Sequence, residues 1–257
     1  MAEELSLTFL GSGTSMGVPV IGCQCPVCQS SDVKDNRLRS SVLFQIGEIN
    51  IVIDSGPDFR YQMLRSGISS LDGLVFTHEH KDHTAGMDDV RAFNFIQQKK
   101  VSVYADKRVE EVLRRDFHYA FAEIKYPGVP EIEIVRIENE PFEVAGTRLI
   151  PIQVMHHKLP VYGFRIGDIS YVTDANYIAP KELKKLTGSK VLVLNALRKQ
   201  KHISHFTLEQ ALEVIDMVKP ERAYLTHISH QMGKHADISA ELPPNVYLAY
   251  DGLKVSA

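Results

Sequence analysis

The chain has 257 residues, of which 44% are hydrophobic and 24% charged, and its formal net charge is −3. This length and composition let one domain over residues 1–257 bury a large core. The chain has no broad basic footprint, which argues against a nucleic acid as the main partner, and no apolar run approaches the length of a membrane span.

The acidic N-terminal residues, Met1 to Glu4, lead directly into a strand-like run and do not form a secretory signal. All three cysteines lie in one short segment, which suits reduced thiols better than a disulfide framework. We therefore expect a cytoplasmic protein.

Strand-like and helix-like stretches alternate along the chain. Short apolar runs predict strands at residues 5–10, 41–46, 49–53, 74–76, 101–104, 132–137, 148–154, 162–166, 169–172, 191–193 and 222–226. Apolar side chains at helical spacing predict helices at residues 58–65, 88–100, 107–122 and 207–218. Gly47 and the pair Gly167-Asp168 are predicted hairpin turns, and Pro220 ends the last helix. The alternation indicates an α/β fold.

The segment Thr77-His78-Glu79-His80-Lys81-Asp82-His83 follows a buried strand and is rich in metal ligands. Side chains at alternating positions of an extended segment point the same way, so His78 and His80 can converge on one ion. Asp82 and His83 come after the chain has begun to turn and can face a second ion. Two divalent metals about 3.5–4 Å apart are a known solution for hydrolysing phosphate or acyl bonds.

Three later strand-like runs also end in possible ligands. His156 and His157 follow the run over residues 147–155, Asp174 follows residues 169–173, and His227 follows residues 222–226. Loops at strand ends are the usual place for a site on a layered scaffold. Imidazole and carboxylate ligands suit Zn²⁺, Mn²⁺ or Fe²⁺. These residues alone leave open whether His156 or His157 is the ligand.

The chain resembles the metallo-β-lactamase superfamily through the opening Phe9-Leu10-Gly11-Ser12-Gly13-Thr14-Ser15 and through the ligand-type residues described above, which occur in the family's order. The resemblance implies a four-layer αββα sandwich, with two mixed sheets flanked by helices. It implies a first metal held by His78, His80 and His156. It implies a second held by Asp82, His83 and His227, with Asp174 bridging the two.

Within the superfamily, the chain is most similar to the phosphoribosyl 1,2-cyclic phosphate phosphodiesterase subgroup. The similarity lies in the cysteine-rich insert, in His157-Lys158-Leu159 and in the run Thr226-His227-Ile228-Ser229-His230-Gln231. At residues 194–198 the chain departs from the phosphodiesterase of phosphonate breakdown, where the comparable strand ends in an acidic residue, because Asn195 stands here. The departure leaves the natural substrate open.

A second metal site is predicted at Cys23, Cys25 and Cys28. An odd number of clustered cysteines favours a metal over intramolecular disulfides. A tetrahedral zinc needs a fourth ligand. We expect it to be His230, which follows His227 by three residues, and the arrangement resembles the structural zinc of the subgroup. Three free thiols in a loop are the alternative.

Asp82 and His205 are the predicted catalytic residues. By resemblance, His205 matches the position that serves as general acid or phosphate contact in the subgroup. The alternative is that Ser204 or His205 caps the helix that follows. Arg198 belongs to a solvated basic run or contacts a substrate phosphate, and Asp54 is expected to orient a ligand histidine.

These residues predict a hydrolase with two catalytic divalent metals, Zn or Mn, and one structural Zn. The favoured activity is a phosphodiesterase on a small cyclic or nucleotide-like phosphate. A tRNA 3′-processing endonuclease is an alternative, although no glycine- or lysine-rich insertion could form its tRNA-clamping arm. A thioester or lactone hydrolase and a non-catalytic metal-binding module are the others, the latter disfavoured because all seven ligand positions are filled. The sequence leaves a homodimer open.

Overall fold

Two mixed β-sheets form the centre of the molecule, which is described here from a computed structural model over residues 4–257. The first sheet has the strand order β15-β1-β2-β3-β4-β5-β6. Its strands are β1 (Leu5–Gly11), β2 (Ser41–Ile46), β3 (Ile49–Ile53), β4 (Gly73–Val75), β5 (Val101–Ala105), β6 (Ile132–Arg136) and β15 (Lys254–Ser256). Neighbours from β15 to β3 are antiparallel, and those from β3 to β6 are parallel.

The second sheet has the order β11-β8-β9-β10-β12-β13-β14, and β7 pairs with β8. Its strands are β7 (Phe142–Val144), β8 (Thr147–His156), β9 (Leu159–Ile166), β10 (Ile169–Val172), β11 (Tyr177–Ile178), β12 (Val191–Asn195), β13 (Arg222–Thr226) and β14 (Val246–Leu248). Like the first sheet, it has an antiparallel half and a parallel half. Neighbouring strands are antiparallel up to β10 and parallel from β10 to β14.

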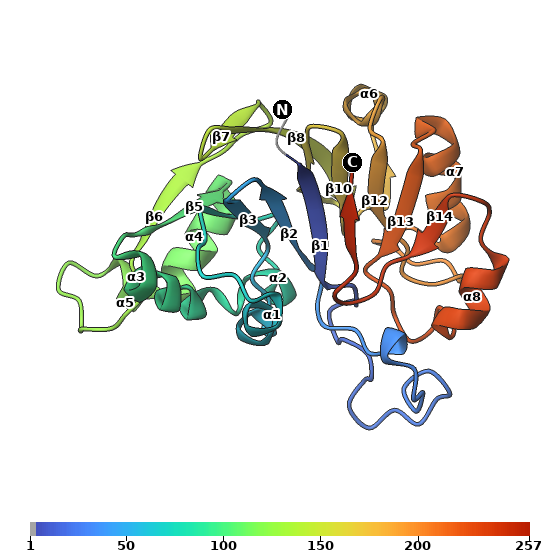
Figure 1. Ribbon diagram of the computed structural model, residues 1–257, viewed down its shortest axis with the longest axis horizontal. Coiled ribbons are helices and arrows are strands. Elements are labelled where there is room, and N and C mark those ends of the chain that lie inside the picture. The colour runs from blue at the N-terminus through green and yellow to red at the C-terminus, as the bar shows by residue number, and fades with distance from the viewer. Residues whose placement is uncertain (1–3) are drawn as a thin grey trace.

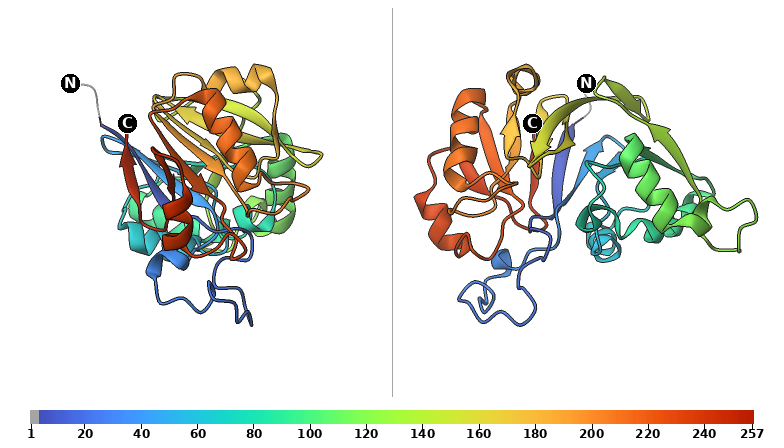
Figure 2. Two further views of the ribbon diagram at one scale, coloured as in Figure 1. Left: turned by 90° about the vertical axis from the view of Figure 1, so that its right-hand side faces the viewer. Right: turned by 180° about the vertical axis from the view of Figure 1, so that it is seen from behind.

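Helices cover the outer face of each sheet (Figures 1 and 2). The helices are η1 (Val33–Asp35), α1 (Phe59–Ser66), α2 (Lys81–Thr84), η2 (Met87–Val90), α3 (Arg91–Gln97), α4 (Lys107–Asp116), α5 (His118–Phe121), α6 (Pro180–Leu186), α7 (Leu208–Val218) and α8 (His235–Glu241). Side chains of α1, α3 and α4 pack on the first sheet, and those of α6, α7 and α8 on the second. The predicted four-layer αββα sandwich is confirmed.

Strand alternation explains the layers. Val191 and Val193 of β12 join the core between the two sheets, whereas Leu192 and Leu194 join the core under α6, α7 and α8. In β3, Val52 packs toward α1 while its two neighbours face the central core. Successive strand residues point to opposite faces, so a strand that is covered on both sides must be apolar throughout.

The sequence missed several elements, namely β7, β11, β14, β15, α6 and α8. The predicted helix at 107–122 was wrong as one helix, because α4 ends at Asp116 and α5 begins at His118. Phe117 leaves helical backbone there (φ −116°, ψ 37°), and its ring is buried in the core of the first sheet. The predicted helix at 88–100 is a 3₁₀ turn up to Val90 followed by α3.

Two loops that carry ligand-type residues are packed tightly together. A Cβ on Gly56 would lie 2.0 Å from the Asp82 carbonyl oxygen, so the loop after β3 can touch the turn of α2 only with glycine there. The Ser55 N–H donates to the His83 carbonyl at 2.8 Å, which fastens the two loops.

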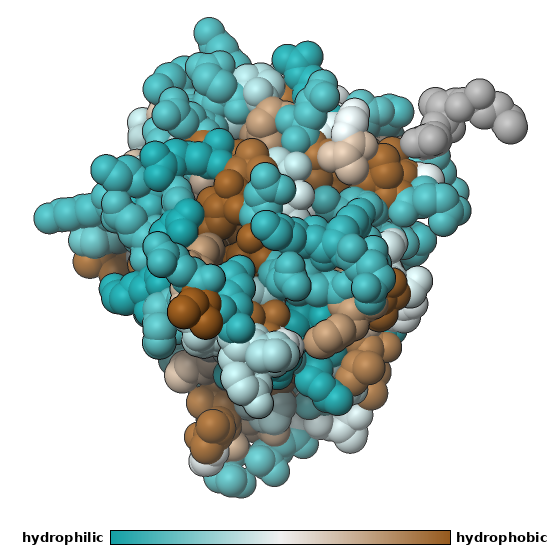
Figure 3. All heavy atoms as spheres, turned by 90° about the vertical axis from the view of Figure 1, so that its left-hand side faces the viewer, coloured by the Kyte–Doolittle hydropathy of each residue, from teal (hydrophilic) through white to brown (hydrophobic). Residues whose placement is uncertain are grey.

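Among the helices that the structure describes, none is both long and apolar enough to cross a membrane. The first three residues, part of the acidic start on which the absence of a secretory signal was argued, lie outside the described range. Polar side chains dominate the face shown in Figure 3, and apolar ones lie scattered among them.

Candidate metal-dependent active site

The first group of ligand-type side chains comes from two strand ends. His78 and His80 follow β4, and His156 is the last residue of β8. Their ligand atoms all lie within 4.8 Å of one another. His156 Nδ1 lies 2.9 Å from the Ser204 carbonyl, which can only accept, so Nε2 is left bare for a metal. His157 is exposed with its backbone at φ 57°, so the structure places His156, and not His157, in this group.

The second group lies beside the first and is centred on Asp174. His83 Nε2 is 3.2 Å from Asp82 Oδ2 and 3.3 Å from Asp174 Oδ2, and His227 Nδ1 is 3.2 Å from the same Asp174 oxygen. Asp82, Asp174 and His227 form one possible ion site, and His78, His83 and Asp174 form another. The seven residues predicted from the sequence therefore lie in adjoining groups, and most of these groups include the buried Asp174 carboxylate.

Asp54 orients two of these imidazoles. His83 Nδ1 donates to Asp54 Oδ2 at 2.7 Å, which leaves His83 Nε2 facing the group. The Thr77 hydroxyl also donates to this carboxylate at 2.8 Å, so its oxygen can accept from His78 Nδ1 at 2.9 Å. The same tautomer is thereby selected at His78. Asp54 thus has the orienting contact expected from the sequence.

Three of these residues have strained backbone. Asp54, Asp174 and His227 have φ values of 66°, 57° and 55°, in the left-handed region that residues other than glycine seldom adopt. Each ends a strand and turns the chain so that its side chain points toward the other ligands. Such conformations cost about 1–3 kcal/mol each and persist at functional sites that the surrounding structure holds in place.

The residues fit divalent metals. His83 Nε2 is buried and makes no hydrogen bond within residues 4–257, although it faces two carboxylates. Burial lowers the pKa of His78 and brings that of His227 to about 3, so these rings are neutral ligands. Burial opposes ionisation of Asp174, yet His227 and His83 hold its pKa well below the usual range. Burial opposes the charged form of His83, yet Asp82 and Asp54 raise its pKa well above the usual value. Imidazoles around an ionised carboxylate are the donor set of Zn²⁺ or Mn²⁺.

His205 faces this centre. It is buried, its Nε2 lies 3.0 Å from Asp174 Oδ1, and its ring stacks on that of His227 with centroids 4.8 Å apart. The alternative role as a helix cap was wrong, because Thr207 caps α7. The Thr207 hydroxyl accepts from the Gln210 N–H at 3.2 Å, and the Gln210 side chain accepts from the Thr207 N–H at 3.0 Å.

Arg198 braces the loop that carries His205. Its guanidinium donates to the carbonyls of Gln200 at 3.2 Å and Lys201 at 3.1 Å, and to the Gln231 side chain. These contacts use three of its five N–H groups, so they favour a structural role over the expected contact with a substrate phosphate.

Three further residues of the site were not predicted as site residues from the sequence. The Asn195 amide accepts from the Ala175 N–H at 2.8 Å and donates to the Ala175 carbonyl at 2.9 Å, which fixes the turn after Asp174. A carboxylate there could not donate, which gives a physical reason for the asparagine. The Ser40 hydroxyl lies 3.1 Å from His227 Nδ1. His202 Nδ1 lies 3.1 Å from His205 Nδ1.

The three cysteines meet His230 at a second candidate metal site. The sulfur atoms of Cys23, Cys25 and Cys28 lie 3.3, 3.4 and 3.5 Å from His230 Nδ1. Zn–S and Zn–N bonds of about 2.3 and 2.0 Å in a tetrahedron put sulfur and nitrogen about 3.5 Å apart, so the spacing fits zinc. The Cys28 backbone N–H, 3.4 Å from the Cys25 sulfur, lowers the pKa of that thiol to about 6.

A polar network fastens the cysteine-rich insert to the C-terminal region. Buried Arg37 donates to the Ser12 hydroxyl at 2.9 Å and to the Ala249 carbonyl at 2.5 Å. Asp35 accepts from the His235 N–H at 2.7 Å. The insert is therefore held at its base as well as at the candidate zinc site.

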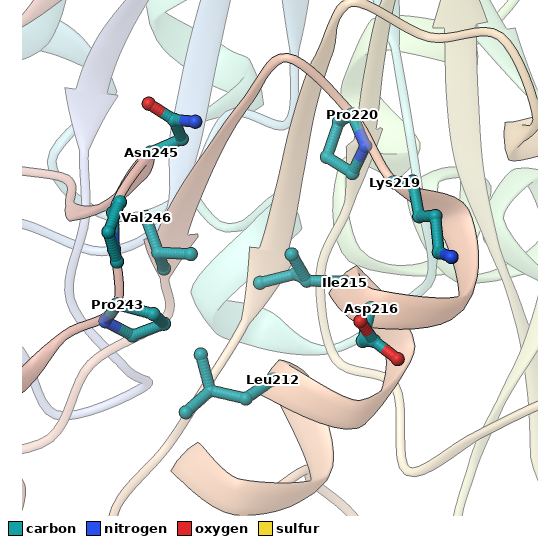
Figure 4. A pocket seen from close by; sticks show the side chains of 9 residues that line it. Leu212, Ile215, Asp216, Lys219, Pro220, Pro243, Asn245 and Val246 are labelled. Atoms are coloured by element: carbon teal, nitrogen blue, oxygen red, sulfur yellow. The ribbon is translucent and has the colours of Figure 1, made fainter.

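A hollow of about 410 Å³ opens beside the first group of ligands. It is lined by His80, His156, His157, Lys158, Leu159 and Ser204. A second hollow, of about 230 Å³, lies between α7 and the segment before β14 (Figure 4). Val246 in its wall pairs with the start of β13, whereas His227 follows the end of that strand, so this second hollow is remote from the candidate site.

Comparison with known proteins identifies the family. A model of the beta-lactamase superfamily domain matches residues 49–228. A crystal structure of "a new diphosphatase from the PhnP family" is 41% identical, has a TM-score of 0.94 and covers 100% of this chain and 98% of its own. The octanoyltransferase of Porphyromonas gingivalis is 41% identical over 250 residues, which are 96% of this chain and 50% of that protein. The ribonuclease Z of Pyrobaculum islandicum is 23% identical over an alignment that covers 96% of each chain.

The chain belongs to the beta-lactamase superfamily and has the metallo-β-lactamase fold. It is similar to the PhnP-family diphosphatase over its whole length. It spans about half the length of the octanoyltransferase that it matches.

Proposed function

We propose that this protein hydrolyses a phosphodiester or diphosphate bond in a small molecule, with two divalent metals. The observation that carries the proposal is the sharing of Asp174 between two groups of ligands while His205 faces the same carboxylate at 3.0 Å. The 41% identity to a PhnP-family diphosphatase supports phosphorus as the reacting centre.

In this proposal His78, His80 and His156 would hold the first ion, Asp82, His83 and His227 would hold the second, and Asp174 would be a ligand of both. Such a pair of ions supplies Lewis acidity and lowers the pKa of water at the site.

The chain's own groups do the remaining work. Asp54 holds the ligand imidazoles in the required tautomers. Lys158 gives the adjoining hollow a cationic side chain for a phosphate, and His157 lines the hollow beside it. Asp82 and His205 are the groups proposed to touch the reacting atoms, and His205 Nε2 is placed to give a proton to the leaving oxygen. Cys23, Cys25, Cys28 and His230 are proposed to hold a zinc that stabilises the insert and takes no part in turnover.

Acyl hydrolysis is the second candidate. The similarity to an octanoyltransferase suggests it. That protein is about twice as long as the matched region, so its name also covers a part that this chain does not match. The ribonuclease Z relatives, at 23% identity, raise RNA cleavage only as a family alternative. We propose that residues 1–257 act as one domain, because side chains from both sheets share the central core.

A substrate panel tests the proposal. The purified protein with added Zn²⁺ or Mn²⁺ is assayed on bis-(p-nitrophenyl) phosphate, a nucleoside 2′,3′-cyclic phosphate, a nucleoside diphosphate ester, a thioester and a lactone. We expect turnover of a phosphorus substrate that is lost in Asp174→Ala. Turnover of the thioester or lactone alone would move the assignment to acyl hydrolysis.

The role of His205 is tested by the leaving group. His205→Ala should lower turnover of a poor alkoxide leaving group by about 10²–10⁴-fold, the usual scale of general acid catalysis. It should barely change the rate with p-nitrophenolate, which leaves without a proton. Equal losses on both substrates would remove His205 from proton transfer.

A further inference from the structure

A second histidine, His202, lies behind His205 on the side away from Asp174. Its Nδ1 is 3.1 Å from His205 Nδ1, and the two ring centroids are 5.0 Å apart. His205 is therefore contacted at both nitrogens, with Nε2 at Asp174 and Nδ1 at His202. An imidazole held at both nitrogens has a fixed ring orientation.

The direction of the hydrogen bond between the two histidines follows from a neighbouring backbone group. The Ser204 N–H, which can only donate, is aimed at His202 Nδ1 at 3.4 Å. His202 Nδ1 is therefore an acceptor, and the proton in the contact belongs to His205 Nδ1. The Ser204 hydroxyl, 3.0 Å from His205 Nδ1 and 3.3 Å from His202 Nδ1, is a second possible acceptor for the His205 Nδ1 proton.

We propose that His202 is a positioning residue for His205: by accepting the Nδ1 proton it keeps Nε2, the nitrogen that exchanges its proton, turned toward the metal centre. The inference rests on the proposed function of His205. When the bond from phosphorus to the leaving oxygen breaks, the oxygen keeps the electron pair and takes the proton from Nε2. Nδ1 keeps its own proton on His202 throughout.

Three variants separate this role from a structural one. In asparagine, Oδ1 is bonded to the same carbon position as Nδ1 in histidine, so His202→Asn retains an acceptor, whereas His202→Leu has none. His202→Leu should lower turnover of an alkoxide substrate by about 10–100-fold, the scale found when an orienting partner of a site imidazole is removed. It should leave p-nitrophenolate release nearly unchanged, and His202→Asn should recover most of the loss. Ser204→Ala tests the rival acceptor, and His118→Leu, at an exposed histidine of α5, is the matched control.

A spectroscopic readout is independent of activity. In ¹⁵N-histidine-labelled protein, a coupling across the hydrogen bond should join Nδ1 of His205 to Nδ1 of His202, and Ser204→Ala should retain it. Absence of this coupling in the wild type, or its loss in Ser204→Ala, would overturn the proposal. If no phosphorus substrate is turned over, the proposed function fails, while the coupling still decides whether His202 accepts from His205.

Discussion

Replacing Asp54 with asparagine tests how the metal centre is organised. Asp54 is fully buried and accepts three hydrogen bonds, from the Thr77 N–H and hydroxyl at 2.8 Å each and from His83 Nδ1 at 2.7 Å. An amide has one acceptor oxygen, which the Thr77 N–H would occupy, so its NH₂ would face His83 Nδ1. His83 must then give up the Nδ1 proton and carry it on Nε2, where a metal should bind. The Thr77 hydroxyl could no longer donate to residue 54, because it would face the same NH₂ group, and its O–H would turn toward His78.

Both metal sites should therefore weaken in Asp54→Asn. Loss of an orienting partner typically costs 10–100-fold in metal affinity, which corresponds to about 1.4–2.7 kcal/mol at 25 °C. Isothermal titration of the metal-free protein with Mn²⁺ measures both sites. Asp72→Asn is the matched control, because Asp72 also accepts a backbone N–H, from Asn50 at 3.0 Å, but lies outside the candidate site. Affinities within about twofold of the wild type at both sites would refute the orienting role of Asp54.

Three further predictions use other parts of the molecule. Asp174→Ala should lose about two metal ions per chain in elemental analysis, since the carboxylate is proposed to bridge both, and full retention would contradict the assignment. Cys25→Ser should lose one zinc and melt at a lower temperature without changing the metal dependence of turnover, whereas three freely titratable thiols in the native protein would argue against the zinc. Burial and the neighbouring Arg37 lower the pKa of His235 to about 4, below the 6.5 expected in the unfolded chain. The unfolded chain therefore binds a proton that the native state does not, and stability should fall between about pH 6.5 and 4 by up to about 1.4 kcal/mol per pH unit. In urea unfolding His235→Gln should show a shallower fall, and an identical slope would exclude His235 as its source.

The sequence determined the chemistry of the site through residue type and position. His78, His80, Asp82 and His83 follow a strand too apolar to be exposed, and Asp174 and His227 end two others. Parallel strands bring their carboxyl ends to one edge of a sheet, so ligands at strand ends must gather there once the layers form. The apolar run over residues 191–193 likewise indicated a strand, and the structure covers both of its faces.

Only the tertiary structure decided which groups touch. The choice of His156 over His157 depends on the left-handed turn that directs the second side chain to solvent. The Ser40 hydroxyl contacts His227, which lies 187 residues later in the sequence, and no local sequence pattern predicts such a contact. The interruption of the helix at Phe117 could not be predicted from the sequence either, because burial of the Phe117 ring outweighs the helical spacing of the residues around it. Neighbouring residues determine the preference of a segment for helix or strand. The hydrogen bonds that select a tautomer or orient a ring depend instead on groups that come together only when the two sheets pack.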